Sequence, residues 1–146
     1  MIRQITMHDL DAIYELNARE LGASTDYDTL RATLERIIHL PDQHFLIGFE
    51  LNGELVGYVH AQYYEMLYSP NVLLNIISMA VNSHIQGQGI GRQLVEAIEQ
   101  ISRTLGLNGI RINSGYNREG AHLFYEKLGY VSNRDQKRYV KLFEEQ

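Results

Sequence analysis

VNSHIQGQGIGR, residues 81–92, joins two segments of different periodicity. Before it lies a mostly apolar run, LLNIISMAV at residues 73–81, which has the length of a buried strand. After it, apolar residues recur at three- and four-residue steps from Ile90 to Leu105, which is typical of an amphipathic helix. Three glycines at positions 87, 89 and 91 lie between the two segments. The pattern predicts a strand, a tight glycine loop and a helix.

A glycine loop at the start of a helix is suited to binding phosphate. Glycine permits positive φ and a close approach of a ligand to the backbone. The first amides of the helix have no partner within the helix, and the positive end of the helix dipole faces the loop. The G-x-G-x-G spacing excludes the dinucleotide fingerprint, because Arg92 stands where the third glycine belongs, and no Gly-Lys-Ser/Thr follows as in an ATP loop.

Two stretches carry a resemblance to a known family. Gln86, Gly89 and Gly91, followed by Arg92, resemble the acetyl-coenzyme A pyrophosphate loop of the GNAT superfamily of N-acetyltransferases. Downstream, NREGAHLFYEKLGY at residues 117–130 is similar to the family's next conserved helix. The chain looks most like the members that acetylate small molecules such as aminoalkylphosphonates and aminoglycosides.

The resemblance implies a set of residues that contact acetyl-coenzyme A. It implies that the backbone of the fourth strand pairs with the pantetheine arm and that Tyr125 protonates the departing thiolate as general acid. A thiol has a pKa of about 8.5 and a phenol of about 10, so the phenol is a usable donor. Asn117 has two compatible roles, capping its helix and contacting the cofactor. The implied cofactor-binding residues are Met79, Ala80, Val81, Gln86, Gly87, Gln88, Gly89, Ile90, Gly91, Arg92, Asn117 and Tyr125.

The general base is left open by the sequence. Many relatives place a glutamate on the fourth strand, where this chain has Ser78, and serine is no base at neutral pH. The candidates are Glu65, His60, the Tyr63/Tyr64 pair, or a water held by backbone carbonyls.

The rest of the chain predicts one domain, residues 1–146, of α/β (α+β) class. The resemblance implies the GNAT fold, a mixed, mostly antiparallel sheet splayed between strands 4 and 5 and flanked by about four helices. Asn52-Gly53 predicts a tight hairpin turn. The predicted strands are residues 2–5, 44–51, 54–64, 73–81, 110–114 and a closing pair within 130–143, and the predicted helices begin at Thr6, at 24–26, at 89 and at Asn117.

Composition excludes several classes of function. The 146 residues include no cysteine, so there is no disulfide framework and no thiolate chemistry. The net charge of −5 disfavours a nucleic-acid partner. The six histidines show no ligand spacing, so we expect no metal. Residues 1–6 lack a signal-peptide core and no apolar run is long enough to span a bilayer, so we expect a cytoplasmic protein with no membrane partner.

The expected function is acetyl transfer from acetyl-coenzyme A to a primary amine, with a small molecule as acceptor. A protein amine (an N-terminus or a lysine) is one alternative, and a non-catalytic acyl-coenzyme A binding or regulatory module is another. Glu15, Glu20, Asp26 and Asp28 would suit a cationic acceptor or, equally, a solvated helix face. The identity of the acceptor, the use of other acyl groups and a homodimer stay open.

Overall fold

The computed structural model describes residues 1–85, 87–113, 119–132 and 137–143. The chain forms two compact units, Met1–Asn113 and Ser114–Gln146. The prediction of one domain over the whole chain therefore stays a prediction.

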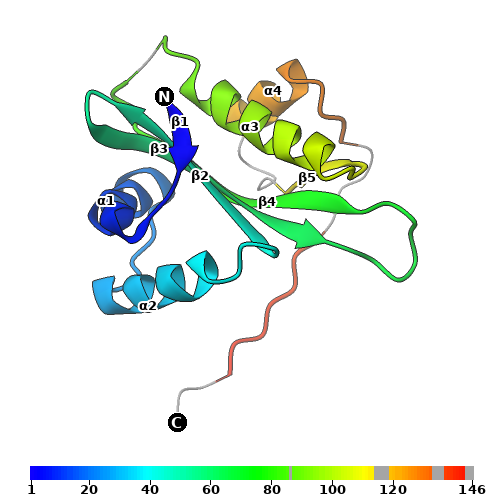
Figure 1. Ribbon diagram of the computed structural model, residues 1–146, viewed down its shortest axis with the longest axis horizontal. Coiled ribbons are helices and arrows are strands. Elements are labelled where there is room, and N and C mark those ends of the chain that lie inside the picture. The colour runs from blue at the N-terminus through cyan, green and yellow to red at the C-terminus, as the bar shows by residue number, and fades with distance from the viewer. Residues whose placement is uncertain (86, 114–118, 133–136, 144–146) are drawn as a thin grey trace. The chain divides into compact units, whose positions relative to one another are not determined.

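A five-stranded sheet in the order β1-β2-β3-β4-β5 forms the first unit (Figure 1). Neighbouring strands are antiparallel except β4 and β5, which are parallel. This confirms the mixed, mostly antiparallel sheet. The last strand is shorter than predicted and ends at Ile112, while Ser114 lies outside the described residues. The strands are β1 (Ile2–Gln4), β2 (His44–Leu51), β3 (Glu54–Tyr64), β4 (Leu73–Val81) and β5 (Gly109–Ile112).

Helices cover both faces of this sheet (Figure 1). On one face lie α1 (Leu10–Leu21) and α2 (Tyr27–Ile38), and on the other lies α3 (Ile90–Thr104). The core under α1 and α2 consists of Ile5, Leu10, Ile13, Leu16, Leu34, Leu55, Tyr58 and Ala80.

The α3 helix approaches the sheet closely at a glycine of β3. Adjacent residues of a strand point to opposite faces, so Gly57 faces α3 while Tyr58 faces α1. A Cβ at Gly57 would lie 3.3 Å from side-chain atoms of both Ile90 and Leu94. Leu94 is fully buried, as the helical periodicity predicted. The start of α3 is thus pressed against the middle of the sheet.

The ends of these elements follow the local chemistry of the sequence. Thr6 accepts a hydrogen bond from the His8 amide at 3.2 Å and caps a short 3-10 helix, η1 (Met7–Asp9), that leads into α1. Gly22 ends α1 with φ 62°, and Asp26 caps α2 through the Thr29 amide at 2.9 Å. The hairpin turn between β2 and β3 has φ 53° at Asn52 and 82° at Gly53, as predicted.

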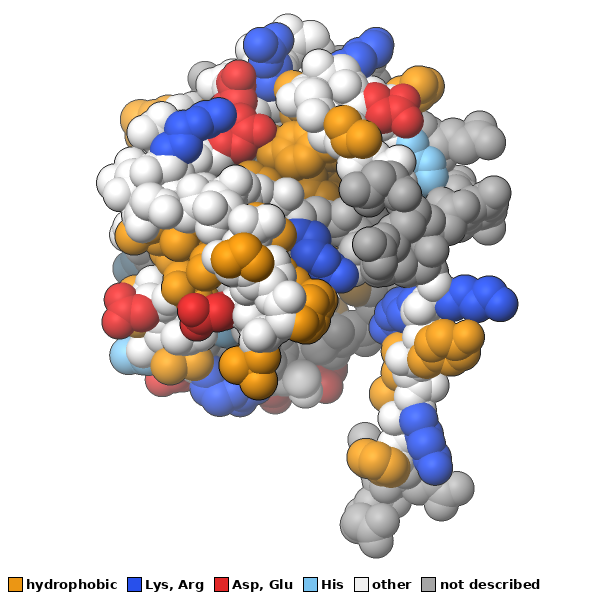
Figure 2. Space-filling model, turned by 90° about the vertical axis from the view of Figure 1, so that its right-hand side faces the viewer, with side chains coloured by type: hydrophobic (Ala, Val, Ile, Leu, Met, Phe, Trp, Pro, Cys, Tyr) orange, Lys and Arg blue, Asp and Glu red, His pale blue; other side chains and the backbone are white. Residues whose placement is uncertain are grey.

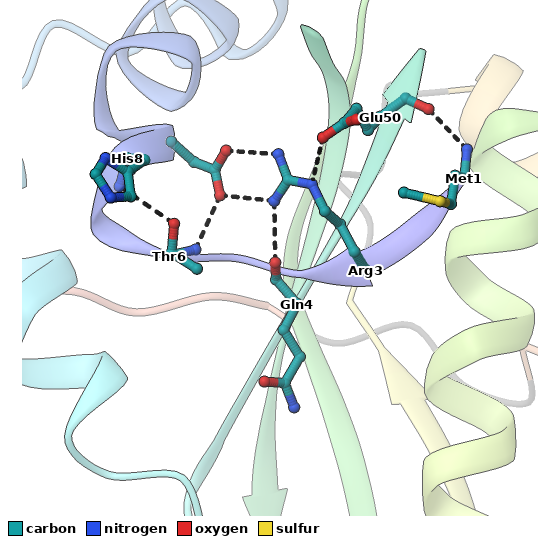
Figure 3. A network of polar contacts seen from close by, with 7 residues as sticks. Met1, Arg3, Gln4, Thr6, His8 and Glu50 are labelled. Carbon is teal, nitrogen blue, oxygen red and sulfur yellow. Dashed lines mark hydrogen bonds and ion pairs between the residues drawn. The ribbon is translucent and has the colours of Figure 1, made fainter. Parts of the chain in front are cut away.

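Arg3 ties β1 to η1 and to β2 (Figure 3). Its guanidinium donates to both carboxylate oxygens of Asp9, at 2.9 and 2.8 Å, and to Glu50 at 2.7 Å. Burial tends to raise the pKa of Asp9, but the hydrogen bonds from Arg3 and the Thr6 amide outweigh it and hold that pKa below its ordinary value. This network fixes the entry into α1, which borders the candidate site described below.

The second unit contains α4 (Glu119–Lys127), which ends near Gly129 at φ 93°. The predicted closing pair of strands is wrong for the described part of 130–143, where no strand is present. A strand is held by hydrogen bonds to a neighbouring strand, and here Tyr139 and Phe143 are each 85% exposed rather than packed on a sheet face. Basic and apolar side chains lie together along residues 137–143 (blue and orange in Figure 2).

None of the helices in the described part of the chain is both long and apolar enough to cross a membrane.

Candidate active site

The sheet parts between β4 and β5. The two strands pair over four residues only, from Leu73 opposite Gly109 to Ile76 opposite Ile112. The next residue, Ile77, is a bulge, because Ile76 lies opposite Ala61 and Ser78 opposite His60 in β3. A bulge bends its strand and ends regular pairing. From Ile77 to Val81, no strand of the described residues pairs with the edge of β4 that faces β5.

The open edge includes the three strand residues that the resemblance implicated. Met79, Ala80 and Val81 pair with β3 on their other side, opposite Val59, Tyr58 and Gly57. The Ala80 side chain is in the core, 3% exposed. Their free backbone groups can pair with an extended ligand in the way an added strand does.

Side chains order the segment that follows β4. The Asn82 amide donates to the Val56 carbonyl at 2.8 Å, and the Asn82 side-chain oxygen accepts from the His84 amide at 2.9 Å. Glu20, in the last turns of α1, accepts from the backbone amide of Ser83 at 2.9 Å and from its hydroxyl at 3.0 Å. The Ser83 amide is the main reason that the pKa of Glu20 is lowered. The segment is therefore attached to α1.

The glycines of the loop have the backbone conformation predicted for them. Gly87 and Gly89 have φ 74° and 63°, and a Cβ at either position would meet no atom within 4 Å. The loop is open on that side. Gln88 and Gly89 are exposed, and Gln86 lies outside the described residues.

The start of α3 presents backbone donors without side-chain competition. Gly89 is the N-cap residue and makes no side-chain cap, and the first turn holds no acidic residue. Among the described residues no acceptor is present for the amides of Gly91 and Arg92. The Arg92 side chain is exposed and forms a 3.4 Å ion pair with Glu96. Free amides at the positive end of a 15-residue helix form an anion site.

Ser78 lies beside a hydrogen bond that joins β3 to α1. The Tyr58 hydroxyl donates to the side-chain oxygen of Asn17. Burial raises the pKa of Tyr58, and the nearby Ser78 side chain offsets part of that effect. The residue at the position of the expected glutamate is thus a neighbour of the bond that holds α1 on the sheet.

His60 of β3, one of the candidate bases, lies beside His44 of the neighbouring strand β2. Nδ1 of His44 lies 2.9 Å from Nε2 of His60. Burial, and then the neighbouring His44, lower the pKa of His60 to about 4. His60 is neutral at pH 7 but too weak a base to take a proton from an alkylammonium of pKa about 10.4. The other candidate carboxylate, Glu65, is exposed just beyond the end of β3.

Residues 10–130 match the sequence model of the acetyltransferase (GNAT) family. The chain belongs to the GNAT acetyltransferase family. An aminoalkylphosphonate N-acetyltransferase from Salmonella typhimurium (strain LT2) is 30% identical over 131 residues, which are 88% of this chain and 83% of that protein. The similarity to this kind of acetyltransferase, inferred from the sequence, is confirmed.

Solved structures share the GNAT fold. A transcriptional regulator from Bacillus halodurans C-125 has a TM-score of 0.86 at 21% identity, covering 97% of this chain and 99% of that one. The aminoglycoside N-acetyltransferase AAC(6')-Iy, solved in complex with CoA, has a TM-score of 0.84 at 17% identity, covering 97% of this chain and 93% of that one.

The GNAT motif around Tyr125 lies in the second unit. On α4, the Tyr125 ring lies edge-on to Phe124, with centroids 5.3 Å apart, and to Tyr130, at 6.2 Å. The side chain is half-buried. Asn117 lies outside the described residues, so its two predicted roles are untested.

Two of the four acidic residues that would suit a cationic acceptor are used in the fold. Glu20 binds Ser83, and Asp26 caps α2. Glu15 and Asp28 are exposed, as expected of a solvated face. In the described part of the chain, no group of three or more His, Cys, Asp or Glu side chains could hold a metal ion.

Three side-chain contacts near the site could not be predicted from the sequence. They are the Glu20–Ser83 link, the Tyr58–Asn17 bond and the His44–His60 pair. Each joins residues between 16 and 63 positions apart, and the individual residues belong to types that are common on any surface. Only the last had a signal, because both histidines lie in strands predicted to form one hairpin.

Proposed function

We propose that this GNAT protein transfers the acetyl group of acetyl-coenzyme A to the primary amine of a small molecule. One observation supports the proposal: an edge of β4 that pairs with no described strand is followed along the chain by an open glycine loop and by amides of α3 that have no described acceptor. An edge for an extended arm and a site for a pyrophosphate are therefore consecutive along 77–92. Coenzyme A has these two parts in the same order.

The residues of the loop fit the pyrophosphate. Backbone amides from Gly87 to Arg92 supply the donors, with Gln86 completing the motif. The absence of a Cβ at Gly87 and Gly89 leaves room for the phosphate oxygens to reach them. In this proposal the backbone of Met79, Ala80 and Val81 binds the amide groups of the pantetheine arm.

The reaction requires one bond to form and one to break. The amine nitrogen attacks the thioester carbonyl, and the carbon–sulfur bond then breaks to release the thiolate. We assign to Tyr125 the proton that this thiolate takes up. The nitrogen loses one proton in becoming an amide. Because His60 is a weak base and Ser78 is none, we assign that proton to water, after the acceptor has bound as its free base.

Positioning then supplies most of the rate enhancement. Two reactants held in line gain up to about 7–11 kcal/mol relative to free collision, provided that their geometry is right. The links from α1 to Ser83 and to Tyr58 keep the wall of the site fixed for this purpose. A small acceptor is favoured by the relative from Salmonella typhimurium, whose name states an aminoalkylphosphonate.

The experiment is steady-state release of thiol from acetyl-coenzyme A with a panel of small amines and peptides. Turnover should appear with at least one small amine and be absent without acceptor. If coenzyme A binds and no amine or peptide is acetylated, the chain is a binding module and the proposal fails. If peptides alone are acetylated, the acceptor class is wrong.

A further inference from the structure

Arg111 is a half-buried cation that pairs with no carboxylate in the described part of the chain. It lies in β5, opposite Asn75 of β4, and this is the second-last pair before the two strands part. Among the described residues no carboxylate forms an ion pair with it, whereas Arg3, the other half-buried arginine described, pairs with Asp9 and Glu50. A guanidinium is charged at every pH at which proteins fold, and burying it without an anion is costly.

Neutral groups hold the Arg111 side chain in place. Its Nη1 donates to the side-chain oxygen of Asn75 at 3.0 Å. With the amide of Asn113 oriented to satisfy both of its atoms, its oxygen accepts from Nη2 at 3.1 Å and from Nη1 at 3.2 Å. The guanidinium also stacks on the Tyr64 ring, 4.8 Å from the centroid. These contacts fix the fork, and none of them, among the residues described, supplies a negative charge.

The position of Arg111 is beside the candidate site. Residues paired across a sheet point to the same face, and alternate residues of one strand do as well. Tyr58, His60 and Gln62 alternate along β3 and therefore point to the same face of the sheet. Gln62 pairs with Asn75 of β4, and Asn75 pairs with Arg111 of β5, so these two side chains point to that face as well. It is the face that carries Ser78 and that α1 and α2 border.

We propose that Arg111 binds an anionic group of the acceptor, so that the substrate is a short amine carrying a phosphonate, phosphate or carboxylate. This inference rests on the proposed function and adds to it the substrate class. The planar fork suits a tetrahedral or planar oxyanion, which it can bind through two parallel hydrogen bonds. The amine of such a substrate then lies a few bonds away, toward the gap between β4 and β5.

A purely structural Arg111, stapling β4 to β5, makes a different prediction. Asn75→Asp separates the two roles. The aspartate keeps the shape of the Asn75 side chain, whose oxygen lies 3.0 Å from Nη1 of Arg111, and it places a negative charge beside the guanidinium. If Arg111 only joins the two strands, the variant should be as stable as the wild type or more stable. If Arg111 binds an anion, the new carboxylate should neutralise it, and the variant should bind an anionic acceptor poorly.

The experiment compares acceptors of similar length: 2-aminoethylphosphonate, β-alanine, propylamine and 1,3-diaminopropane. The wild type should prefer the first two in kcat/KM, and their ratio tells phosphonate from carboxylate. Arg111→Gln should lower kcat/KM for the anionic acceptors by roughly 10- to 100-fold, mainly through KM, and leave propylamine unchanged. Asn75→Asp should do the same without lowering Tm. Arg103→Gln, which removes an exposed arginine from the last turn of α3, is the control and should match the wild type.

A binding measurement keeps this inference separate from the catalytic one. Calorimetry with 2-aminoethylphosphonate and the protein saturated with coenzyme A should give heat in the wild type and a roughly 10- to 100-fold weaker Kd in Arg111→Gln. If acetylation fails but this difference is found, the anion site stands and the transferase proposal falls. If amines are acetylated with no preference for anions, or if Arg111→Gln affects all acceptors equally, the anion site is refuted. If no acceptor is acetylated and 2-aminoethylphosphonate does not bind, both the transferase proposal and the anion site are refuted.

Discussion

Replacing Gly89 by aspartate should weaken the binding of coenzyme A about a hundredfold and leave the chain folded. Gly89 is the N-cap of α3 at φ 63°, with no atom within 4 Å of a Cβ built there. Asparagine and aspartate tolerate this left-handed conformation better than other residues with a side chain. The expected change in the free energy of unfolding is within about 1 kcal/mol, or about 4 °C in Tm for a chain of this size.

The effect on binding is electrostatic. Aspartate at this position places a negative charge next to the amides that we assign to the pyrophosphate. At a separation of about 6 Å and an effective dielectric constant of about 40, each pair of unit charges repels by about 1.4 kcal/mol. Two phosphate charges then cost about 3 kcal/mol, which is about a hundredfold in Kd.

Gly89→Asn is the matched control, because it has the same shape and the same tolerance of positive φ but no charge. Calorimetric titration of coenzyme A should give a Kd about a hundredfold weaker for Gly89→Asp than for Gly89→Asn. The difference should shrink as salt is added, since screening weakens charge repulsion. Equal affinities in the two variants, with both folded, would refute the assignment of the pyrophosphate to the start of α3.

Three further perturbations test other parts of the account. Tyr125→Phe keeps the ring contacts with Phe124 and should lower kcat by about 10²–10⁴-fold, with little change in coenzyme A affinity; unchanged turnover in a chemistry-limited assay would remove the general-acid role. His60 should titrate by NMR at a pKa of about 4, and because the unfolded chain protonates near pH 6.5, stability should decline as pH falls from there toward 4; a normal pKa would contradict the His44–His60 geometry. Asp9→Asn should cost about 1–3 kcal/mol in urea unfolding at pH 7 and should flatten the loss of stability below about pH 4, since the lowered pKa of Asp9 stabilises the fold only while its carboxylate is charged; a variant as stable as the wild type would contradict this role.

Local chemistry explains why the first 113 residues could be predicted well. Asn52-Gly53, Gly22 and Asp26 each act within a few residues of chain, so their turn and cap geometry follows from residue type. The run 73–81 became β4 with the predicted bounds, because its length and apolar character suit a strand covered on both faces.

Contacts between distant residues could not be predicted in this way. Glu20 and Ser83 are 63 positions apart, and neither is a residue type that signals a partner. Ser78 could be identified as a departure from the family, but the bond from its neighbour Tyr58 to Asn17 required coordinates. The closing strands within 130–143 were predicted from the local sequence, although a strand depends on a partner that the local sequence does not show.

The most direct test of the central claim is transfer of a carbon-13-labelled acetyl group, followed by NMR and mass spectrometry of the acceptor. Acetyl-coenzyme A labelled at the carbonyl is incubated with the protein and the small amines named above. We predict that the label appears in an amide on the amine nitrogen, in one-to-one ratio with released coenzyme A, and at a much lower rate with Gly89→Asp. Label that stays on coenzyme A or passes only to water, in the presence of every amine tested, would contradict the assignment of this chain as a small-molecule N-acetyltransferase.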